Sequence, residues 1–236
     1  MVSAWEELAP GVARRRLPGW DATVGAVAGP EGVLVVDAGA SLDEGAAVRR
    51  EVEARFGCPV THLVLTHPHF DHVLGAGAFP EARLYGAAGL EDRVHGDPEG
   101  LREDAVCHGL DARLAAEACA APPPPALPVE GELAVSLGDR RVVLAYLGPA
   151  HTAHDLVVLV PGEGGHPPVV FCGDLVEESG EPQAGPDAHG TSWPGTLDRL
   201  LALGGPDARY VPGHGAVVDA PFVAAQRRTL AGRFGD

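Results

Sequence analysis

The chain has 236 residues, of which 45% are apolar, and its formal net charge at neutral pH is −16. Because all of its basic residues are arginines and the acidic excess is large, we expect it to bind neither nucleic acid nor an anionic membrane surface. No run approaches the roughly 20 apolar residues that span a bilayer. The N-terminus also lacks the basic-then-apolar order of a secretory signal, which predicts a cytoplasmic protein.

The first half of the chain alternates short apolar runs with helical patterns. Residues 22–28 and 33–37 are predicted to form two strands joined by a Gly-Pro-Glu-Gly turn. Ser41, followed three residues later by Glu44, is typical of the start of a helix, and Gly57 is typical of its end. Further strands are expected at residues 60–66 and 83–85, and a mostly helical stretch at 99–120, which ends at the proline run 122–125.

The second half continues this alternation without repeating the sequence of the first. Strands are expected at residues 133–137, 142–147, 156–160, 169–172 and 210–212, and helices at 193–203, with Ser192 as the cap, and at 221–234. This order indicates two β-sheets packed face to face with helices outside both, in a single domain over residues 1–236. Residues 91–128 are predicted to form a helical insertion or lid within that domain.

The strongest chemical signal is a histidine-rich segment, His67-Pro68-His69-Phe70-Asp71-His72, directly after the strand predicted at 60–66. Pro68 disfavours a helix here, so we expect these side chains on a loop at the carboxyl end of the strand. Imidazole nitrogens with some carboxylate oxygen suit a borderline cation such as zinc. The sequence therefore predicts a metal site that is built in part from this segment.

Three further polar residues stand at the ends of apolar runs, each close to a glycine that lets the backbone turn sharply. His151 follows the strand predicted at 142–147, Asp174 follows 169–172, and His214 follows 210–212. A single histidine after a strand is more often a hydrogen-bonded residue than a ligand. Taken together and in this order, however, the three are expected to complete the metal site.

With Asp37, these residues resemble the metallo-β-lactamase superfamily over residues 20–215, in the settings VVDAG, THPHFDH, GPAHT, FCGDL and VPGHG. The resemblance implies an α/β fold, a four-layer αββα sandwich in which two mixed sheets carry helices on both outer faces. It implies that His67, His69 and His151 hold a first metal, that Asp71, His72 and His214 hold a second, and that Asp174 bridges both. Asp37 would orient a ligand without binding metal, and a role as a simple strand cap is the alternative.

The resemblance also implies a reaction. Two metal ions, zinc in preference to iron or manganese, would hold a bridging hydroxide that attacks a small-molecule substrate. Asp71 and Asp174 are the candidates for accepting a proton during the reaction. The bond cleaved is expected to be an ester, thioester, lactone or related bond.

The complete ligand set is more similar to the glyoxalase II, lactonase and esterase branches than to secreted β-lactamases. The commonest class of those has Cys at the position of Asp174 and no His at the position of His72. The short segment after His214 differs from glyoxalase II, and no Tyr follows Asp174 as it does in quorum-quenching lactonases. The alternative is a persulfide dioxygenase, an oxidoreductase that uses one iron on the same fold. The oligomeric state is left open.

Other residues near these motifs have roles that the sequence does not assign. His154 is expected beside the site or at the surface, and His189 lies in a stretch, 177–192, that reads as a loop next to the site. This loop and the insertion at 91–128 are expected to govern substrate choice. The four cysteines form no CxxC pair and are expected to be reduced thiols outside the metal site; they are Cys58, Cys107, Cys119 and Cys172.

Overall fold

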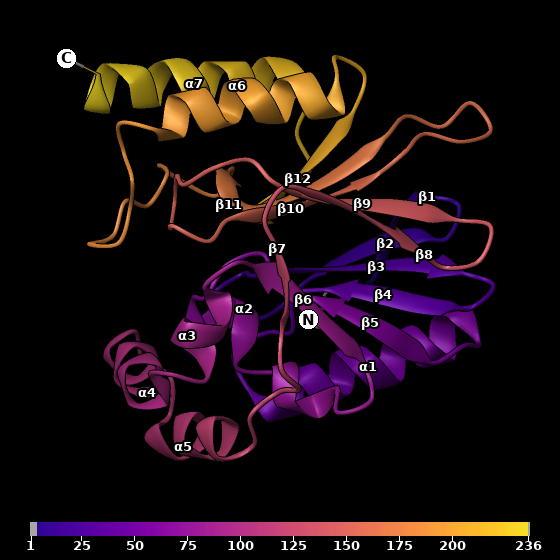
Figure 1. Ribbon diagram of the computed structural model, residues 1–236, viewed down its shortest axis with the longest axis vertical. Helices are drawn as coiled ribbons and strands as arrows, with labels where there is room; N and C mark the ends of the chain where they lie inside the picture. The colour runs from indigo at the N-terminus through magenta and orange to yellow at the C-terminus, as the bar shows by residue number, and fades with distance from the viewer. Residues whose placement is uncertain (1–3, 236) are drawn as a thin grey trace.

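The computed structural model describes residues 4–235, whose strands form two sheets (Figure 1). The first sheet has the order β1-β2-β3-β4-β5-β6-β7, with strands at Glu6–Ala9, Val12–Arg16, Thr23–Gly29, Gly32–Val36, Val60–Val64, Arg83–Ala87 and Leu127–Val129. The second has the order β12-β11-β10-β9-β8, with β8 at Glu132–Ser136, β9 at Arg141–Tyr146, β10 at Leu156–Val160, β11 at Val169–Glu177 and β12 at Arg209–His214. Both sheets are mixed, since β4 to β7 and the β11–β12 pair are parallel and the remaining pairs are antiparallel.

Helices cover the outer face of each sheet, which confirms the four-layer αββα sandwich. Helix α1 (Leu42–Phe56) lies against the first sheet, and α6 (Trp193–Gly204) and α7 (Ala220–Phe234) cover the second (Figure 1). Apolar side chains fill the space between the two sheets, and they include Leu34, Leu144 and Phe171. Further apolar clusters join each sheet to its helices, so burial of apolar surface holds all four layers together.

The ends of α1 follow the prediction from sequence. The Ser41 hydroxyl accepts a hydrogen bond from the Glu44 amide at 3.3 Å, and Gly57 ends the helix in the left-handed conformation with φ of 70°. Ser192 stands at the N-cap position of α6, as predicted, but it does not cap through its side chain. The Ser192 hydroxyl caps no amide of the helix and donates instead to the Pro149 carbonyl at 2.8 Å, which ties the helix start to the segment before His151.

The insertion between β6 and β7 contains three short helices, α3 (Leu90–Val94), α4 (Pro98–Cys107) and α5 (Ala112–Ala120). Helices α4 and α5 pack on α2 (Phe70–Val73), which η1 (Ala76–Ala78) follows, whereas Leu90 and Val94 of α3 join the core beneath the first sheet. Leu110, Ala115 and Ala118 are buried in that contact, so the apolar side of the insertion faces the sandwich. Among the helices of residues 4–235, none combines the length and the apolar character that crossing a bilayer requires.

The hairpin of β1 and β2 was not predicted from sequence. Strand β2 has the sequence VARRR, which reads as a basic surface segment, yet Arg14 and Arg15 are buried. Arg14 donates to the Gly215 carbonyl at 2.8 Å and pairs with Glu6, and Arg15 pairs with Glu51. Buried arginines of this kind are tolerated because each has an acidic partner.

The topology brings the carboxyl ends of several strands to one edge of the sandwich. Strands β4 and β5 are parallel neighbours in the first sheet, and β11 and β12 are parallel neighbours in the second. A bridge between Ala22 and His214 joins the two sheets at this edge. Segments that are far apart in the sequence, after β4, β5, β9 and within β11 and β12, therefore meet there.

Candidate metal centre

The first sheet contributes four of the predicted ligands through the segment after β5. His67 and His69 lie on the connection, as predicted, but Asp71 and His72 belong to the one-turn helix α2. The prediction of a loop throughout was therefore wrong for these two. His69 is the residue before the helix and has an extended backbone, so Pro68 lies outside the helix and does not interrupt it.

The second sheet places Asp174, in the middle of β11, opposite these histidines. Its Oδ2 atom lies 3.8 Å from His67 Nε2, 3.5 Å from His151 Nε2 and 3.3 Å from His214 Nε2, and its Oδ1 lies 3.3 Å from His72 Nε2. Asp71 Oδ2 lies 3.6 Å from His72 Nε2 and 3.4 Å from His214 Nε2. The structure thus brings together all seven residues that the sequence nominated.

These seven residues form two adjacent sets of potential ligand atoms. One set contains His67, His69, His151 and Asp174, and the other contains Asp71, His72 and His214. Within each set, the ligand atoms lie within 4.8 Å of one another. The two sets are adjacent, since His72 Nε2 of the second lies 3.3 Å from Asp174 Oδ1 of the first.

Hydrogen bonding at the centre also fits a metal-binding role. His67 Nε2 and Asp174 Oδ1 are both buried and make no hydrogen bond within the described part of the chain. A buried polar atom without a partner costs free energy, whereas a cation between these atoms would satisfy both. The donor set of imidazole nitrogen and carboxylate oxygen matches zinc and other first-row metals.

Each histidine is held from behind through the ring nitrogen that faces away from Asp174. His67 Nδ1 lies 3.0 Å from Thr66 Oγ1, and His72 Nδ1 lies 2.9 Å from Asp37 Oδ2. The remaining contacts are His69 Nε2 to Asp187 Oδ2 at 3.0 Å, His151 Nδ1 to the Gln183 carbonyl at 2.9 Å, and His214 Nδ1 to the Trp20 carbonyl at 2.8 Å. Such contacts fix the tautomer and the direction of a ligating imidazole.

Asp37 contacts both ends of the histidine-rich segment, Thr66 directly before it and His72 at its end. Its Oδ1 accepts from the Thr66 amide and its Oδ2 from the Thr66 hydroxyl, both at 2.8 Å, and Oδ2 also faces His72. The backbone of Asp37 is left-handed, with φ of 61°, which turns its carboxylate inward directly after β4. The structure gives Asp37 contacts beyond those of a strand cap.

Burial and charge divide the imidazoles into two kinds in the metal-free protein. Burial lowers the pKa of His67 and of His151. Burial alone would also lower the pKa of His72, but Asp71, Asp174 and Asp37 together raise it well above its ordinary value. Burial is likewise outweighed at His214, where Asp174 raises the pKa to about 9.

Metal binding is therefore expected to release protons near neutral pH. At pH 7.5 metal-free His214, with a pKa of about 9, carries a proton that a metal must displace. The apparent metal affinity should fall as pH is lowered from about 9, because protons then compete more strongly for the imidazole. Calorimetric titration of metal into the chelator-treated protein, in two buffers of different ionisation enthalpy, measures the release. Equal heats in both buffers at pH 7.5 would contradict this expectation.

Glycine is required beside the central carboxylate. A Cβ atom at Gly213 would lie 1.8 Å from Asp174 Oδ1 and 2.9 Å from the backbone carbon of Gly173. Gly213→Ala should therefore displace Asp174 and lower metal affinity by about tenfold or more. Competition with a chromogenic chelator measures the affinity. Gly232→Ala is the matched control, because nothing lies within 4 Å of a Cβ there, and equal losses in both variants would contradict the prediction.

Asp187 and Asp155 were missed by the sequence analysis. Asp187 lies in the loop between β11 and α6 and reaches His69 across the chain, a contact that no local pattern reveals. Asp155 is buried and accepts hydrogen bonds from the amides of Ala150 and Thr152, at 3.1 Å and 2.9 Å, so it holds the turn that carries His151. The short spacing between Thr152 and Asp155, which lets one side chain close the turn, is a local signal from which this role of Asp155 could have been predicted.

Neutralising Asp187 should weaken the metal site without removing a ligand. Asp187→Asn keeps the shape of the side chain but removes the charge that orients His69, and metal affinity should fall by about tenfold. Glu181→Gln, in the same loop and exposed, is the control and should leave the affinity unchanged. Equilibrium dialysis with elemental analysis gives both values. An unchanged affinity in Asp187→Asn would show that His69 needs no such support.

The other histidines and the cysteines lie outside the centre. His154 faces the Ala88 carbonyl at 2.9 Å, at the turn before α3, and the His189 side chain is exposed. All four cysteines are free thiols. Cys172 is buried, its thiol donates to the Val170 carbonyl, and burial raises its pKa, so it remains a core residue.

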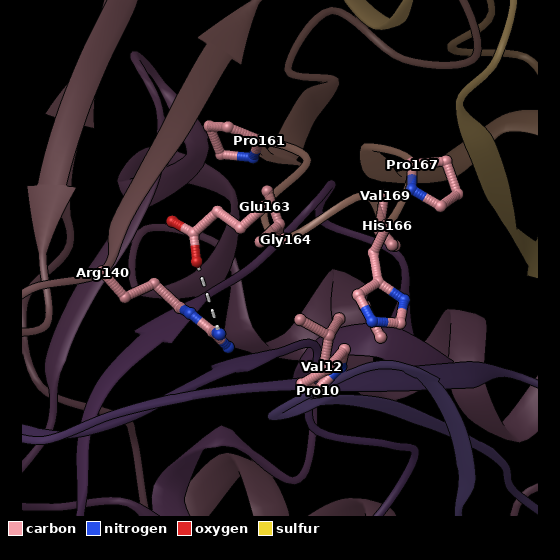
Figure 2. A pocket seen from close by; sticks show the side chains of 11 residues that line it. Pro10, Val12, Arg140, Pro161, Glu163, Gly164, His166, Pro167 and Val169 are labelled. Carbon is pink, nitrogen blue, oxygen red and sulfur yellow. Dashed lines mark ion pairs between the residues drawn. The ribbon is translucent and has the colours of Figure 1, made fainter.

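A cleft of about 470 Å³ opens over the metal centre. Its walls come from the Trp20 region, α2, the insertion and the loop between β11 and α6. A separate hollow of about 350 Å³ lies at the β1–β2 turn, where Arg140 and Glu163 approach to 3.7 Å beside His166 (Figure 2). None of the potential metal-ligand clusters found in residues 4–235 includes a residue of this hollow, so the cleft is the candidate for catalysis.

Comparison with known proteins agrees with this geometry. A family model described as metallo-beta-lactamase superfamily matches residues 17–214. Metallo-beta-lactamase type 2 of Bacteroides fragilis is 38% identical over 86 residues, which are 35% of this chain and 32% of that protein. Linear primary-alkylsulfatase of Pseudomonas sp. (strain ATCC 19151) is 36% identical over 73 residues, 28% of this chain and 14% of that protein. The matches thus span a third or less of each curated relative.

Solved structures share the whole fold at low sequence identity. The solved structure of TMB-1 superposes with a TM-score of 0.74 at 16% identity and covers 100% of both chains. The DIM-1 metallo-beta-lactamase superposes with a TM-score of 0.73 at 17% identity and covers 99% of both chains. At this identity the likeness establishes the fold and leaves the substrate open.

Proposed function

The chain belongs to the metallo-β-lactamase superfamily, and from this premise we propose that it is a dinuclear metallo-hydrolase that cleaves an ester, thioester, lactone or related bond of a small molecule. One observation carries the proposal: the Asp174 carboxylate faces four imidazole Nε2 atoms at 3.3–3.8 Å, where two sets of ligand atoms meet. Zinc is the metal we favour because catalytic zinc sites take imidazole nitrogens together with carboxylate oxygens, as both sets offer.

The residues divide naturally between the two ions. His67, His69 and His151 would hold the first, and Asp71, His72 and His214 the second, with Asp174 shared by both. When bound, such ions bring the pKa of a coordinated water towards neutrality and polarise the substrate carbonyl. Asp71 and Asp174 would lie beside both metal ions, where each could accept a hydrogen bond from that water and so orient it. Either carboxylate could then take up the proton, although coordination to a metal would make it a weak base.

The walls of the cleft support hydrolysis by water rather than by a protein nucleophile. Among the described residues that line it, none is Ser, Thr, Cys or Lys. Covalent catalysis by a hydroxyl, thiol or amine therefore has no candidate there. The buried histidines and Asp174 keep bulk water from one side of the centre, while the cleft admits substrate from the other.

The choice of bond rests on the ligand set. The curated relatives are named as a β-lactamase and an alkylsulfatase, and the short matches give no reason to transfer either substrate. We place the chain with the glyoxalase II-like and esterase branches because Asp174, rather than Cys, stands at the centre and His72 completes the second set. Carbonyl substrates are the class that this branch proposal predicts.

Elemental analysis of protein purified without added metal, paired with a panel of thioesters, lactones and aryl esters, tests the proposal. We expect close to two zinc ions per chain and turnover of at least one panel member that a chelator abolishes and zinc restores. One iron per chain, with O2 uptake on a glutathione persulfide and no ester turnover, would replace the proposal by the oxidoreductase alternative.

A further inference from the structure

The outer walls of the cleft are acidic. Asp97 and Asp104 lie at the start and in the body of α4, and Asp187 lies on the facing loop. Figure 1 shows α4 and the connection from β11 to α6 on the same side of the molecule, at the left of the view. Arg93 is the one Arg or Lys among the described lining residues, and its Nη1 lies 4.0 Å from Asp97 Oδ2, so this cation is already paired.

One wall of the cleft is also aromatic. The Trp20 and Phe70 rings meet edge to face with centroids 5.2 Å apart, and Phe70 stacks on His108 at 5.6 Å. The Trp20 indole is fixed in place because it donates to the His108 carbonyl at 3.3 Å. Leu101 adds an apolar side chain from α4 to the same cleft. An apolar or aromatic group would bury surface against this wall.

We propose, on the basis of the hydrolase function above, that the cleft selects substrates with an aromatic or apolar group that is neutral or cationic and rejects substrates that carry a negative charge away from the bond cleaved. Metal ions, when bound, would attract an anion most strongly at the reacting end, because the attraction falls with distance. The far end of a substrate that extends along α4 meets Asp97 and Asp104 instead, where a second negative charge is repelled. An aromatic wall beside carboxylates suits a cationic group in particular.

Three esters that share one acyl scaffold and differ in the substituent at its remote end test this selection. They are 4-nitrophenyl esters of a phenylalkanoic acid whose para substituent is methyl, trimethylammonium or carboxylate. For the zinc-loaded protein, kcat/KM should be at least about fivefold lower for the carboxylate ester than for the methyl ester, and as high or higher for the ammonium ester. Adding salt should shrink these differences, because the carboxylates of the cleft are partly exposed.

The double variant Asp97→Asn/Asp104→Asn assigns the effect to the wall. Asparagine at position 97 retains the cap that accepts from the Gly100 amide, and the His108 ring keeps its contact with the Asp104 backbone carbonyl. The ratio of kcat/KM for the carboxylate ester to that for the methyl ester should rise by about fivefold. The metal centre is common to both proteins, so direct attraction to the ions cancels in this comparison. The double variant Asp139→Asn/Asp207→Asn removes the same number of charges at two exposed positions outside the cleft, and it should leave the ratio unchanged.

The outcomes separate this selection from the proposed function. Equal kcat/KM for the three esters, or a ratio that the double variant does not move, overturns the charge selection while the hydrolase function stands. If none of the esters is turned over, the hydrolase function fails for this class. The selection is then decided by the dissociation constants of the three corresponding amides, measured by calorimetry on the zinc-loaded protein, where weakest binding of the carboxylate supports it and tightest or equal binding overturns it.

Discussion

Asp174→Ala should strip both metal ions from the protein and reduce kcat/KM on the order of a thousandfold or more. The reason is positional: this one carboxylate lies within 3.8 Å of four imidazole nitrogens that belong to both ligand sets. Without this carboxylate, two dications among buried side chains would have less negative charge beside them, so their binding would be weaker. Elemental analysis after dialysis, with kcat/KM on the best ester of the panel, measures both losses.

Matched variants make this result interpretable. His67→Ala should remove the first metal ion. Part of the second ion should stay bound, because its ligands Asp71, His72 and His214 remain. His154→Ala removes an imidazole that contacts the Ala88 carbonyl instead of the centre, and it should leave the metal content unchanged. Retention of two ions per chain by Asp174→Ala would refute the bridging role, and loss of an ion from His154→Ala would show that the ligand scheme is incomplete.

The residues that gather at the centre could be predicted because each one stands at or near the end of an apolar run that is visible in the sequence. Their neighbours could not, since the contacts depend on the fold rather than on spacing. Asp187 meets His69 from 118 residues away, and the Trp20 carbonyl meets His214 from 194 residues away. A sequence pattern carries no record of such contacts, although they fix the direction of the imidazoles as firmly as local turns do.

Elements were missed where a local preference pointed away from the final structure. The basic sequence of β2 favours solvent, and it is buried only because Glu6, Glu51 and the Gly215 carbonyl accept from its arginines. Pro68 disfavours a helix that includes it, but α2 begins two residues later and has a single turn, too short for any periodicity to reveal. The layers themselves were predictable, because each rests on apolar periods over many residues.

Asp37→Ala should both destabilise the protein and lower its affinity for the second metal ion, although Asp37 binds no metal in the ligand scheme. The substitution leaves the Thr66 amide, the Thr66 hydroxyl and His72 Nδ1 without their common acceptor in a site where Asp37 is 2% exposed. Unsatisfied buried groups, with alanine forced into a left-handed backbone, should cost about 2–4 kcal/mol in the free energy of unfolding. Freeing His72 should lower metal affinity by about 10- to 100-fold.

Asp37→Asn separates the two effects, because asparagine tolerates the left-handed backbone and keeps one acceptor oxygen. That oxygen can serve either Thr66 or His72, but not every donor that the carboxylate serves, and the amide nitrogen adds a donor beside them. We therefore expect a smaller loss of stability than in Asp37→Ala, measured by urea unfolding of the metal-free proteins, with a loss of metal affinity that stays large. If both variants lose stability and neither loses metal affinity, Asp37 supports the end of β4 alone and the direction of His72 is set by the centre itself.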